Sequence, residues 1–156
     1  MSFLGKSEAA RPQWLKFPLG LLALILVVAA AKTSGRLASE ALSKEADQPL
    51  SKEQISTVLK KIQAGMRDQL PIRVDPQITW MDVIVVNSRI SYIYSLNVAV
   101  PLDRRADFIS NVLSSNRSNF CDDQGFRRVI DSGGSISWLY KEQGGEVIEA
   151  VLDTCN

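Results

Sequence analysis

The sequence predicts an α+β protein, in which an N-terminal transmembrane helix precedes a small antiparallel sheet packed by two or three helices and cross-linked by one disulfide. Three observations predict this class. One uncharged apolar run lies near the N-terminus, at residues 17–31. Helix-like and strand-like periodicities then follow in the order α-β-β-α-α-β-β, which favours an antiparallel sheet over a doubly wound fold. The two cysteines, Cys121 and Cys155, both lie beyond the apolar run.

The apolar run predicts a membrane anchor. With Lys16 reaching the interface, residues 14–31 are just long enough to span a bilayer. Basic residues before the run would hold residues 1–13 in the cytoplasm. A signal peptide cleaved near residues 29–31 is the alternative that this pattern leaves open. The side chains expected to contact lipid are Trp14, Phe17, Leu21, Leu24, Ile25 and Val28.

Residues 32–49 are polar and predict a linker, so that residues 50–156 form a periplasmic α+β domain held at the inner membrane by a single pass. In this exported part, the pair Cys121 and Cys155 predicts a disulfide. Closing a loop of about 35 residues stabilises a fold by about 4 kcal/mol in the chain-entropy model. Two separate buried thiols are the alternative.

A first helix is predicted to begin after Ser51, which can form a capping box with Gln54. Leu50 and Ile55 stand at the two positions of a hydrophobic staple. Apolar residues at three- and four-residue spacing then continue to Met66. This stripe predicts a helix with one face in the core.

Residues 78–100 predict a hairpin with its turn at residues 87–88, and an extra strand at residues 72–74 is left open. In the second arm, apolar and polar residues alternate as far as Val100, so one face of the strand is buried. Asp103 is placed to cap the helix that follows.

Residues 114–120 are polar and predict a loop that leads to Cys121. Asp122 and Asp123 can cap a short helix after that loop. Residues 135–155 then predict a second hairpin around a Gly-Gly turn.

The composition argues against most catalytic, metal and cofactor chemistry. No histidine is present, which removes the usual general base and the commonest metal ligand. A net charge of +1 leaves the exported part nearly neutral, so nucleic-acid binding is not expected. Helix capping explains Asp122 and Asp123 better than acid–base catalysis does. Ser137 with Lys141 is a weak candidate for a nucleophile and its base. We expect no enzyme activity, no cofactor and no metal.

Trp80 is the aromatic residue that is hardest to assign to the core. It stands opposite Met81, Val83 and Val85 in a strand that is apolar on both faces, which indicates that a partner or another element covers part of it. These four residues are the candidate partner surface. The other aromatics at alternating strand positions are expected in the core: Tyr92, Tyr94, Trp138 and Tyr140.

The order of motifs over residues 70–156 resembles that of small bacterial envelope domains. The motifs are Y-x-Y at Tyr92 and Tyr94, Cys121, the Gly133-Gly134 turn, W-L-Y at Trp138 to Tyr140, Gly144-Gly145 and Cys155. They are loosely similar to the α/β pilotins of type II secretion. That resemblance implies a role in delivering or stabilising a larger membrane complex. Pilotins are lipoproteins, whereas here a peptide anchor stands in place of the lipidated cysteine.

Taken together, the sequence predicts a membrane-anchored, non-catalytic periplasmic interaction module with a protein partner, serving as an accessory or assembly subunit of an envelope or secretion complex. Homo-oligomerisation is left open. One alternative is an inhibitor, immunity or exclusion protein that acts against a toxin or phage. Another is an enzyme of unrecognised type.

Overall fold

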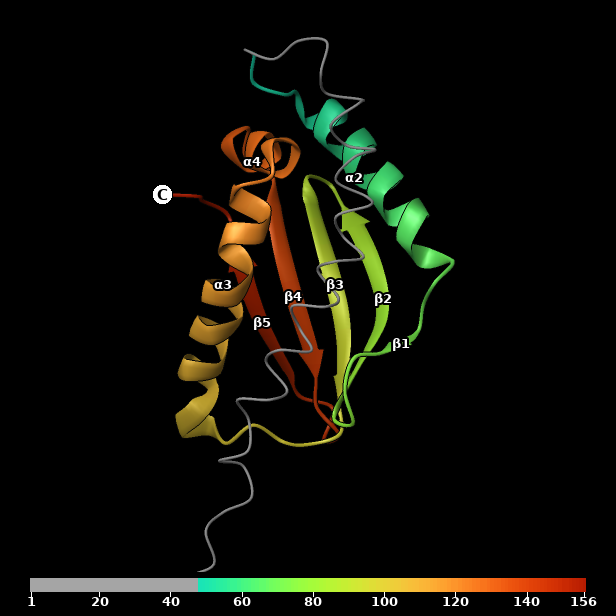
Figure 1. Cartoon of the computed structure of the whole chain (residues 1–156), viewed down its shortest axis with the longest axis vertical. Helices are drawn as coiled ribbons and strands as arrows, with labels where there is room; N and C mark the ends of the chain where they lie inside the picture. Colours follow the sequence, from blue (N-terminus) through green and yellow to red (C-terminus); the bar gives the residue numbers. More distant parts are fainter. Residues whose placement is uncertain (1–47) are drawn as a thin grey trace, which may run out of the picture.

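Five strands form one sheet in the order β1-β2-β3-β4-β5 within residues 48–156, the part of the chain that this computed structural model describes (Figure 1). The strands are β1 (Ile72–Arg73), β2 (Ile78–Val86), β3 (Arg89–Leu96), β4 (Ser135–Lys141) and β5 (Val147–Leu152). The helices are α2 (Lys52–Arg67), the 3-10 helix η2 (Leu102–Arg104), α3 (Arg105–Cys121) and α4 (Gln124–Asp131). The predicted α+β class is confirmed, and the strand left open at residues 72–74 is present as β1.

The predicted membrane anchor, residues 14–31, lies outside the described residues, as do the leader and nearly all of the linker. Within residues 48–156, no helix combines the length and the apolar character needed to cross a membrane.

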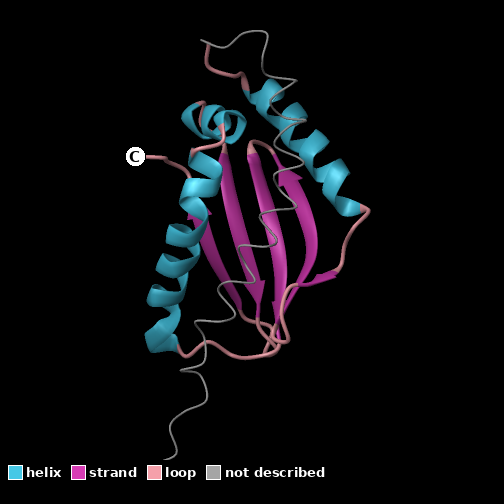
Figure 2. Cartoon of the chain, viewed as in Figure 1, coloured by secondary structure: helices cyan, strands magenta, loops and turns pink. Residues whose placement is uncertain are grey.

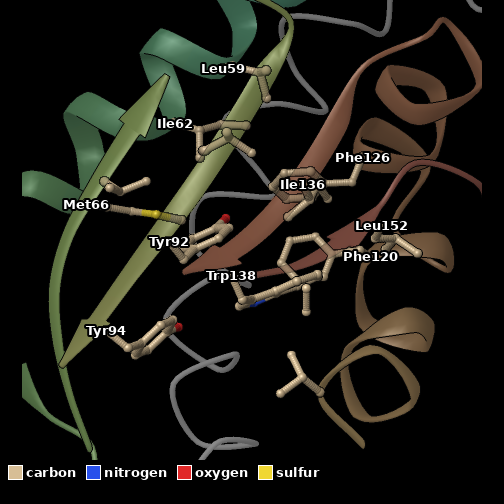
Figure 3. Packing of buried hydrophobic residues seen from close by; sticks show 14 of the residues in the cluster. Leu59, Ile62, Met66, Tyr92, Tyr94, Phe120, Phe126, Ile136, Trp138 and Leu152 are labelled. Atoms are coloured by element: carbon tan, nitrogen blue, oxygen red, sulfur yellow. The ribbon is translucent and has the colours of Figure 1, made fainter. Parts of the chain in front are cut away.

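The helices α2, α3 and α4 pack on one face of the sheet (Figure 2). α2 contacts β2 and β3, α3 contacts β5, and α4 contacts β4. Aromatic and aliphatic side chains from the sheet and the helices interlock between these layers (Figure 3). The expected core aromatics Tyr92, Tyr94, Trp138 and Tyr140 are all buried there. We call the opposite face of the sheet, which no described helix covers, the outer face.

Helix α2 begins as its sequence predicts. Ser51 is the N-cap, and its hydroxyl accepts the backbone N–H of Gln54 while the Gln54 side chain accepts the N–H of Ser51. Both partners of the capping box are therefore satisfied. The predicted stripe is buried from Ile55 to Met66, and it fixes α2 against β2.

The prediction of a wholly antiparallel sheet is wrong at one place. The two hairpins, β2–β3 and β4–β5, are antiparallel as expected. However, β3 and β4 pair in parallel, with Tyr92 opposite Trp138 and Tyr94 opposite Tyr140. A parallel pair needs a long crossover connection, and the chain supplies it as η2, α3 and α4 between the two strands.

Two predictions about α3 are also wrong. Asp103 does not cap the helix, because it lies within the 3-10 helix η2, which begins after Pro101. The N-terminus of α3 has no side-chain cap. The polar residues 114–120 are not a loop but the last turns of α3. Their side chains bond within the helix: the Asn116 amide donates to the carbonyl of Val112 at 2.8 Å, and Asn119 bonds the carbonyl four residues before it in the same way.

Helix α4 is capped by Asp123 as predicted, since its carboxylate accepts the backbone N–H groups of Gly125 and Phe126. The Gly133-Gly134 pair then turns the chain into β4. A Cβ on Gly134 would lie 2.5 Å from Cγ1 of Val129 and 2.8 Å from the carbonyl oxygen of Val129. Only glycine allows this close approach between α4 and the start of β4.

Candidate functional site

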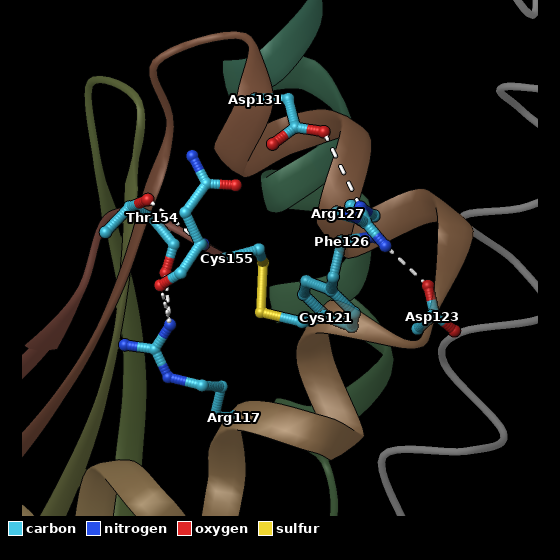
Figure 4. Close-up of a disulfide and its surroundings, with 9 residues drawn as sticks. Arg117, Cys121, Asp123, Phe126, Arg127, Asp131, Thr154 and Cys155 are labelled. Atoms are coloured by element: carbon cyan, nitrogen blue, oxygen red, sulfur yellow. Dashed lines mark hydrogen bonds and ion pairs between the residues drawn. A yellow bond between two sulfur atoms is a disulfide. The ribbon is translucent and has the colours of Figure 1, made fainter.

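The predicted disulfide is present and joins α3 to the segment after β5 (Figure 4). Cys121 is the last residue of α3, and Cys155 follows β5 by three residues. Beside the disulfide, the guanidinium of Arg117 donates to the carbonyl oxygens of Thr154 at 3.2 Å and Asn156 at 2.8 Å. The covalent link and these hydrogen bonds hold the exit of β5 against α3. The alternative of two separate thiols is thereby excluded.

A buried carboxylate fixes the other end of β5. Glu142 is 4 % exposed and lies in the β4–β5 turn. Its Oε1 accepts the backbone N–H of Val100 at 2.7 Å, and its Oε2 pairs with the guanidinium of Arg105 at 2.9 Å. Arg105 also pairs with Glu146. The hydrogen bond between Arg105 and Glu146 raises the pKa of Arg105 and lowers the pKa of Glu146.

We call Glu142, Arg105 and Glu146 the Glu142 cluster. The predicted length of the first hairpin is wrong, and this cluster provides the reason. β3 ends at Leu96, four residues before the predicted end at Val100. The alternation continues past Leu96, and Val100 is buried. Its N–H binds the Glu142 carboxylate instead of a strand, so that the chain leaves the sheet and enters η2.

The predicted partner surface on β2 is divided between core and solvent. Trp80 is only 3 % exposed and Val83 is fully buried, whereas Met81 is 45 % exposed and Val85 is half-buried. The prediction that Trp80 stands opposite Val83 is wrong, because a β-bulge between Trp80 and Asp82 shifts the register. The bulge turns Trp80 and Val83 to the same face.

The outer edge of β2 is closed as far as Val83 by β1 and by the chain's own side chains. β1 pairs with β2 only at Thr79 and Trp80. Beyond β1, the Gln63 side chain donates to the carbonyl oxygen of Val83 at 2.8 Å, and the Asp82 carboxylate accepts the Val83 N–H at 2.8 Å. The indole of Trp80 donates to the carbonyl oxygen of Asp82 at 3.0 Å. We call this closed stretch of β2 the sealed edge.

The edge of β5, at the other end of the sheet, has a different character. The N–H of Glu142 donates to the carbonyl of Glu146 at 2.8 Å, and this hydrogen-bonded pair lies one step beyond Lys141 and Val147, the last pair of the β4–β5 ladder. Hydrogen-bonded and non-hydrogen-bonded pairs alternate along an antiparallel ladder. The backbone groups of Val147, Glu149 and Val151 therefore point away from β4. We call these three residues the open edge.

The outer face of the sheet has an apolar centre, and the side chain of Arg89 crosses it to polar partners on β4 and β5. Its half-buried apolar side chains include Ile93 and Leu139. Arg89 reaches from β3 across β4, where it donates to the Ser135 hydroxyl at 3.1 Å and pairs with Glu149 of β5 at 3.1 Å.

The serine–lysine pair considered from the sequence does not form a catalytic arrangement in this structure. The hydroxyl of Ser137 is fully buried on the outer face and donates to the hydroxyl of Ser91 at 2.7 Å. Lys141 is exposed and makes no hydrogen bond to Ser137. Asp123 is occupied by capping α4. Within residues 48–156, no group of three or more acidic or cysteine side chains could hold a metal ion.

The three tyrosines lie on β3 and β4 and are buried in the core between the sheet and the helices. Tyr94 stacks on Tyr140 at 5.0 Å between ring centroids, and Tyr92 stacks on Trp138 at 6.3 Å. Burial raises the pKa of each phenol well above its ordinary value. The hydroxyls of Tyr92 and Tyr140 find no hydrogen-bond partner in the part of the chain that the structure describes. These rings are structural, and their phenols remain neutral at physiological pH.

The open edge and the Glu142 cluster are the features that the sequence analysis missed. Glu142 and Arg105 are 37 residues apart, so no local pattern joins them. The position of β5 at the end of the sheet depends on the parallel pairing of β3 with β4. One signal was available: the segment from Glu146 to Asp153 contains three acidic residues and no basic one.

No family model matches this sequence, and no curated protein does. Among solved structures, the fold is similar to that of a Pseudomonas aeruginosa protein described as secreted. That similarity has a TM-score of 0.54 at 16 % identity and covers 70 % of this chain and 99 % of that chain. At this identity the likeness shows the fold alone.

Two further matching structures are type II secretion pilotins. EpsS from Vibrio vulnificus gives a TM-score of 0.49 at 17 % identity and covers 65 % of this chain and 89 % of that chain. AspS from Vibrio cholerae gives a TM-score of 0.45 at 16 % identity and covers 65 % and 90 % respectively. The loose resemblance to pilotins stated from the sequence is thus found again among solved structures.

Proposed function

We propose that this chain is a membrane-anchored, non-catalytic interaction module of the periplasm, which serves as an accessory or assembly subunit of an envelope or secretion complex. The observation that carries the proposal is the contrast within the described domain. Within residues 48–156, the helices cover one face of a cross-linked sheet, while no helix covers the outer face and no strand pairs with the open edge. The proposed contacts are membrane lipid, through residues 14–31, and a protein in the envelope.

The disulfide supports the proposed compartment. Structural disulfides persist in oxidising environments such as the periplasm and are rare in the cytosol. Cys121 and Cys155 are joined, and no other cysteine occurs in the chain. The P. aeruginosa protein of similar fold is described as secreted, which agrees with an exported domain.

The roles of the polar side chains support a binding function rather than catalysis. The most buried carboxylate, Glu142, is engaged by Arg105 and by a backbone N–H. The buried hydroxyl of Ser137 bonds Ser91 and has no base beside it. Structural partners therefore account for the groups that would be the first candidates for acid–base or nucleophilic chemistry.

The resemblance to pilotins at Tyr92, Cys121, Trp138 and Cys155 implies an assembly role, and it is the reason for proposing a subunit of a larger complex. Because a peptide anchor replaces the lipidated cysteine of pilotins, we place this chain at the inner membrane and do not assign it transport to the outer membrane.

The test uses the full chain with a C-terminal tag in its native membrane. Under the proposal, carbonate extraction leaves the chain in the membrane pellet, and mild-detergent purification after periplasmic cross-linking recovers a stoichiometric envelope protein. The matched control replaces residues 1–31 by a cleavable secretory signal, which should release the domain into the soluble periplasm. Release of the native chain by carbonate would overturn the anchor. Consistent isolation of the native chain alone would overturn the interaction role.

A further inference from the structure

The open edge presents strand backbone that nothing else in the described domain uses. Val147, Glu149 and Val151 each point one N–H and one carbonyl away from β4. β5 is the last strand of the sheet, and within residues 48–156 no loop backbone and no side chain hydrogen-bonds to these six groups. Val147 is 55 % exposed, so the first part of the edge is accessible. An unpaired edge of this kind is a template for an added strand.

The open edge also lacks the protection that the sealed edge has. Edges are commonly blunted by proline, by a bulge, by very short strands or by a covering side chain. The sealed edge uses three of these: the two-residue β1, the bulge after Trp80 and the Gln63 amide on Val83. The six residues of β5 contain no proline and pair with β4 without a register shift.

Both ends of the open edge are held in place before any partner arrives. At the exit of β5, the Cys121–Cys155 disulfide and Arg117 fix the chain to α3. At its entry, the Arg105 guanidinium holds Glu142 and Glu146 of the turn. A preorganised edge loses little conformational entropy on binding, which favours affinity.

Charge identifies the kind of strand that fits. Glu146, Glu149 and Asp153 lie on β5 or at its ends, and no basic residue lies between them. Glu149 remains 42 % exposed although it pairs with Arg89, so its carboxylate can accept another cation. Opposite charges on directly facing strand residues stabilise a pair, and like charges destabilise it.

A second copy of this chain is the wrong occupant for the same reason. In a two-fold antiparallel pairing, the register that joins all three open-edge residues places Val147 opposite Val151 and Glu149 opposite Glu149 of the other copy. Two carboxylates would then face each other at the centre of the new ladder. A strand with lysine or arginine at that position has the complementary charge.

We propose that the open edge of β5 binds an extended segment of the partner protein by strand addition, with a lysine or arginine of that segment opposite Glu149. This inference rests on the proposed interaction function and specifies where the partner binds. The partner backbone bonds Val147, Glu149 and Val151, and its basic side chain lies on the outer face beside Glu149.

The test measures binding of labelled peptides to the full chain in a non-ionic detergent, by fluorescence anisotropy. The probe is a peptide of about eight residues in which valine alternates with lysine, long enough to pair with a strand of this length. The comparison peptide carries glutamate in place of lysine. We expect the lysine peptide to bind at least about tenfold more tightly than the glutamate peptide.

Val147→Pro and Val147→Ala form the matched pair of variants. Both remove the side chain, but only proline removes the outward N–H, and it leaves the β4–β5 ladder intact. We expect Val147→Pro to weaken binding of the lysine peptide at least about tenfold and Val147→Ala to leave it within about threefold of wild type. Equal binding by the two variants would overturn strand addition. Thermal unfolding checks that both variants fold.

Glu149→Lys tests the charge independently and keeps the proposal falsifiable should Val147→Pro fail to fold. It should reverse the preference in favour of the glutamate peptide, and an unchanged preference would overturn the complementary charge. A wild-type dimer that Val147→Pro disrupts would assign the edge to a second copy and overturn the proposed occupant. Recovery of the same cross-linked envelope partner by Val147→Pro would refute the site while leaving the proposed function in place.

Discussion

The sheet has two edges, and the chain treats them differently. At the sealed edge, side chains from α2 and from β2 itself occupy the outward backbone groups of Asp82 and Val83. At the open edge, the outward groups of Val147, Glu149 and Val151 have no partner in the described residues. Along its length β5 is hydrogen-bonded only on the side that faces β4, while the disulfide and Arg105 fix its two ends. The backbone groups of the sealed edge are therefore blocked, whereas those of the open edge are unpaired in the described residues and held in a fixed position.

The largest effect on this contrast should come from removing the disulfide. The double variant Cys121→Ser and Cys155→Ser frees the exit of β5 from α3, and the chain-entropy model gives a loss of about 4 kcal/mol in the free energy of unfolding. Urea unfolding of the full chain in detergent measures it. Hydrogen exchange should increase more in β5 than in β2.

Wild-type protein treated with reductant is the control for that variant, because it loses the same bond without a substitution. The two should unfold at similar urea concentrations. Equal increases in exchange along β2 and β5 would contradict the view that the disulfide specifically holds the open edge.

The second largest effect should come from Glu142→Ala, which frees the entry of β5. Removing one member of a buried, hydrogen-bonded pair leaves Arg105 without its buried partner and the Val100 N–H unpaired. The expected loss is about 3 kcal/mol in the free energy of unfolding. Glu142→Gln is the control, since its amide oxygen can still accept the Val100 N–H and should preserve part of the stability. Equal losses for both variants would assign the whole effect to charge.

The elements that the sequence predicted well are those whose cause is local. The capping box of Ser51 and Gln54 and the stripe behind it lie within one helix. Both hairpins are marked by alternation around short turns, and the turn residue Asn87 has the positive φ of 54° that such a turn requires. The disulfide followed from the count of cysteines and the exported context.

The elements that the sequence did not predict have causes distant along the chain. The parallel pairing of β3 with β4 depends on how α3 and α4 pack, not on either strand. Helix α3 continues through polar residues because Asn116 bonds its own helix and Phe120 is buried in the core. The bulge after Trp80 reverses the side-chain alternation, and it divided the predicted partner surface into two parts. The open edge could be located only once the strand order was known.

A smaller effect is expected from opening the sealed edge. Gln63→Ala removes the donor to the Val83 carbonyl, and one such hydrogen bond contributes about 1 kcal/mol to the free energy of unfolding. The exposed Gln69 lies in the turn just after α2, so Gln69→Ala is a control that removes the same side chain without an edge contact, and it should change stability by less than about 0.5 kcal/mol. If Gln63→Ala is no less stable than Gln69→Ala, the carbonyl of Val83 does not depend on that amide.

The smallest effect is expected from the exposed ion pair of Arg105 and Glu146 at the entry of β5. It can be detected because its contribution to the free energy of unfolding depends on pH. The hydrogen bond from Arg105 lowers the pKa of Glu146 in the folded state below its ordinary value of 4.5. Because the unfolded chain then binds the proton more readily, this carboxylate stabilises the fold at pH values above 4.5, and the contribution disappears as the pH falls through the folded-state pKa. Glu146→Gln should therefore be less stable than wild type at neutral pH, and the difference should shrink on acidification. Urea unfolding of both proteins across the acidic range measures the difference, and NMR titration of the Glu146 carboxyl measures the pKa directly. A difference that grows on acidification would mean that the ion pair with Arg105 does not stabilise the turn from which the open edge begins.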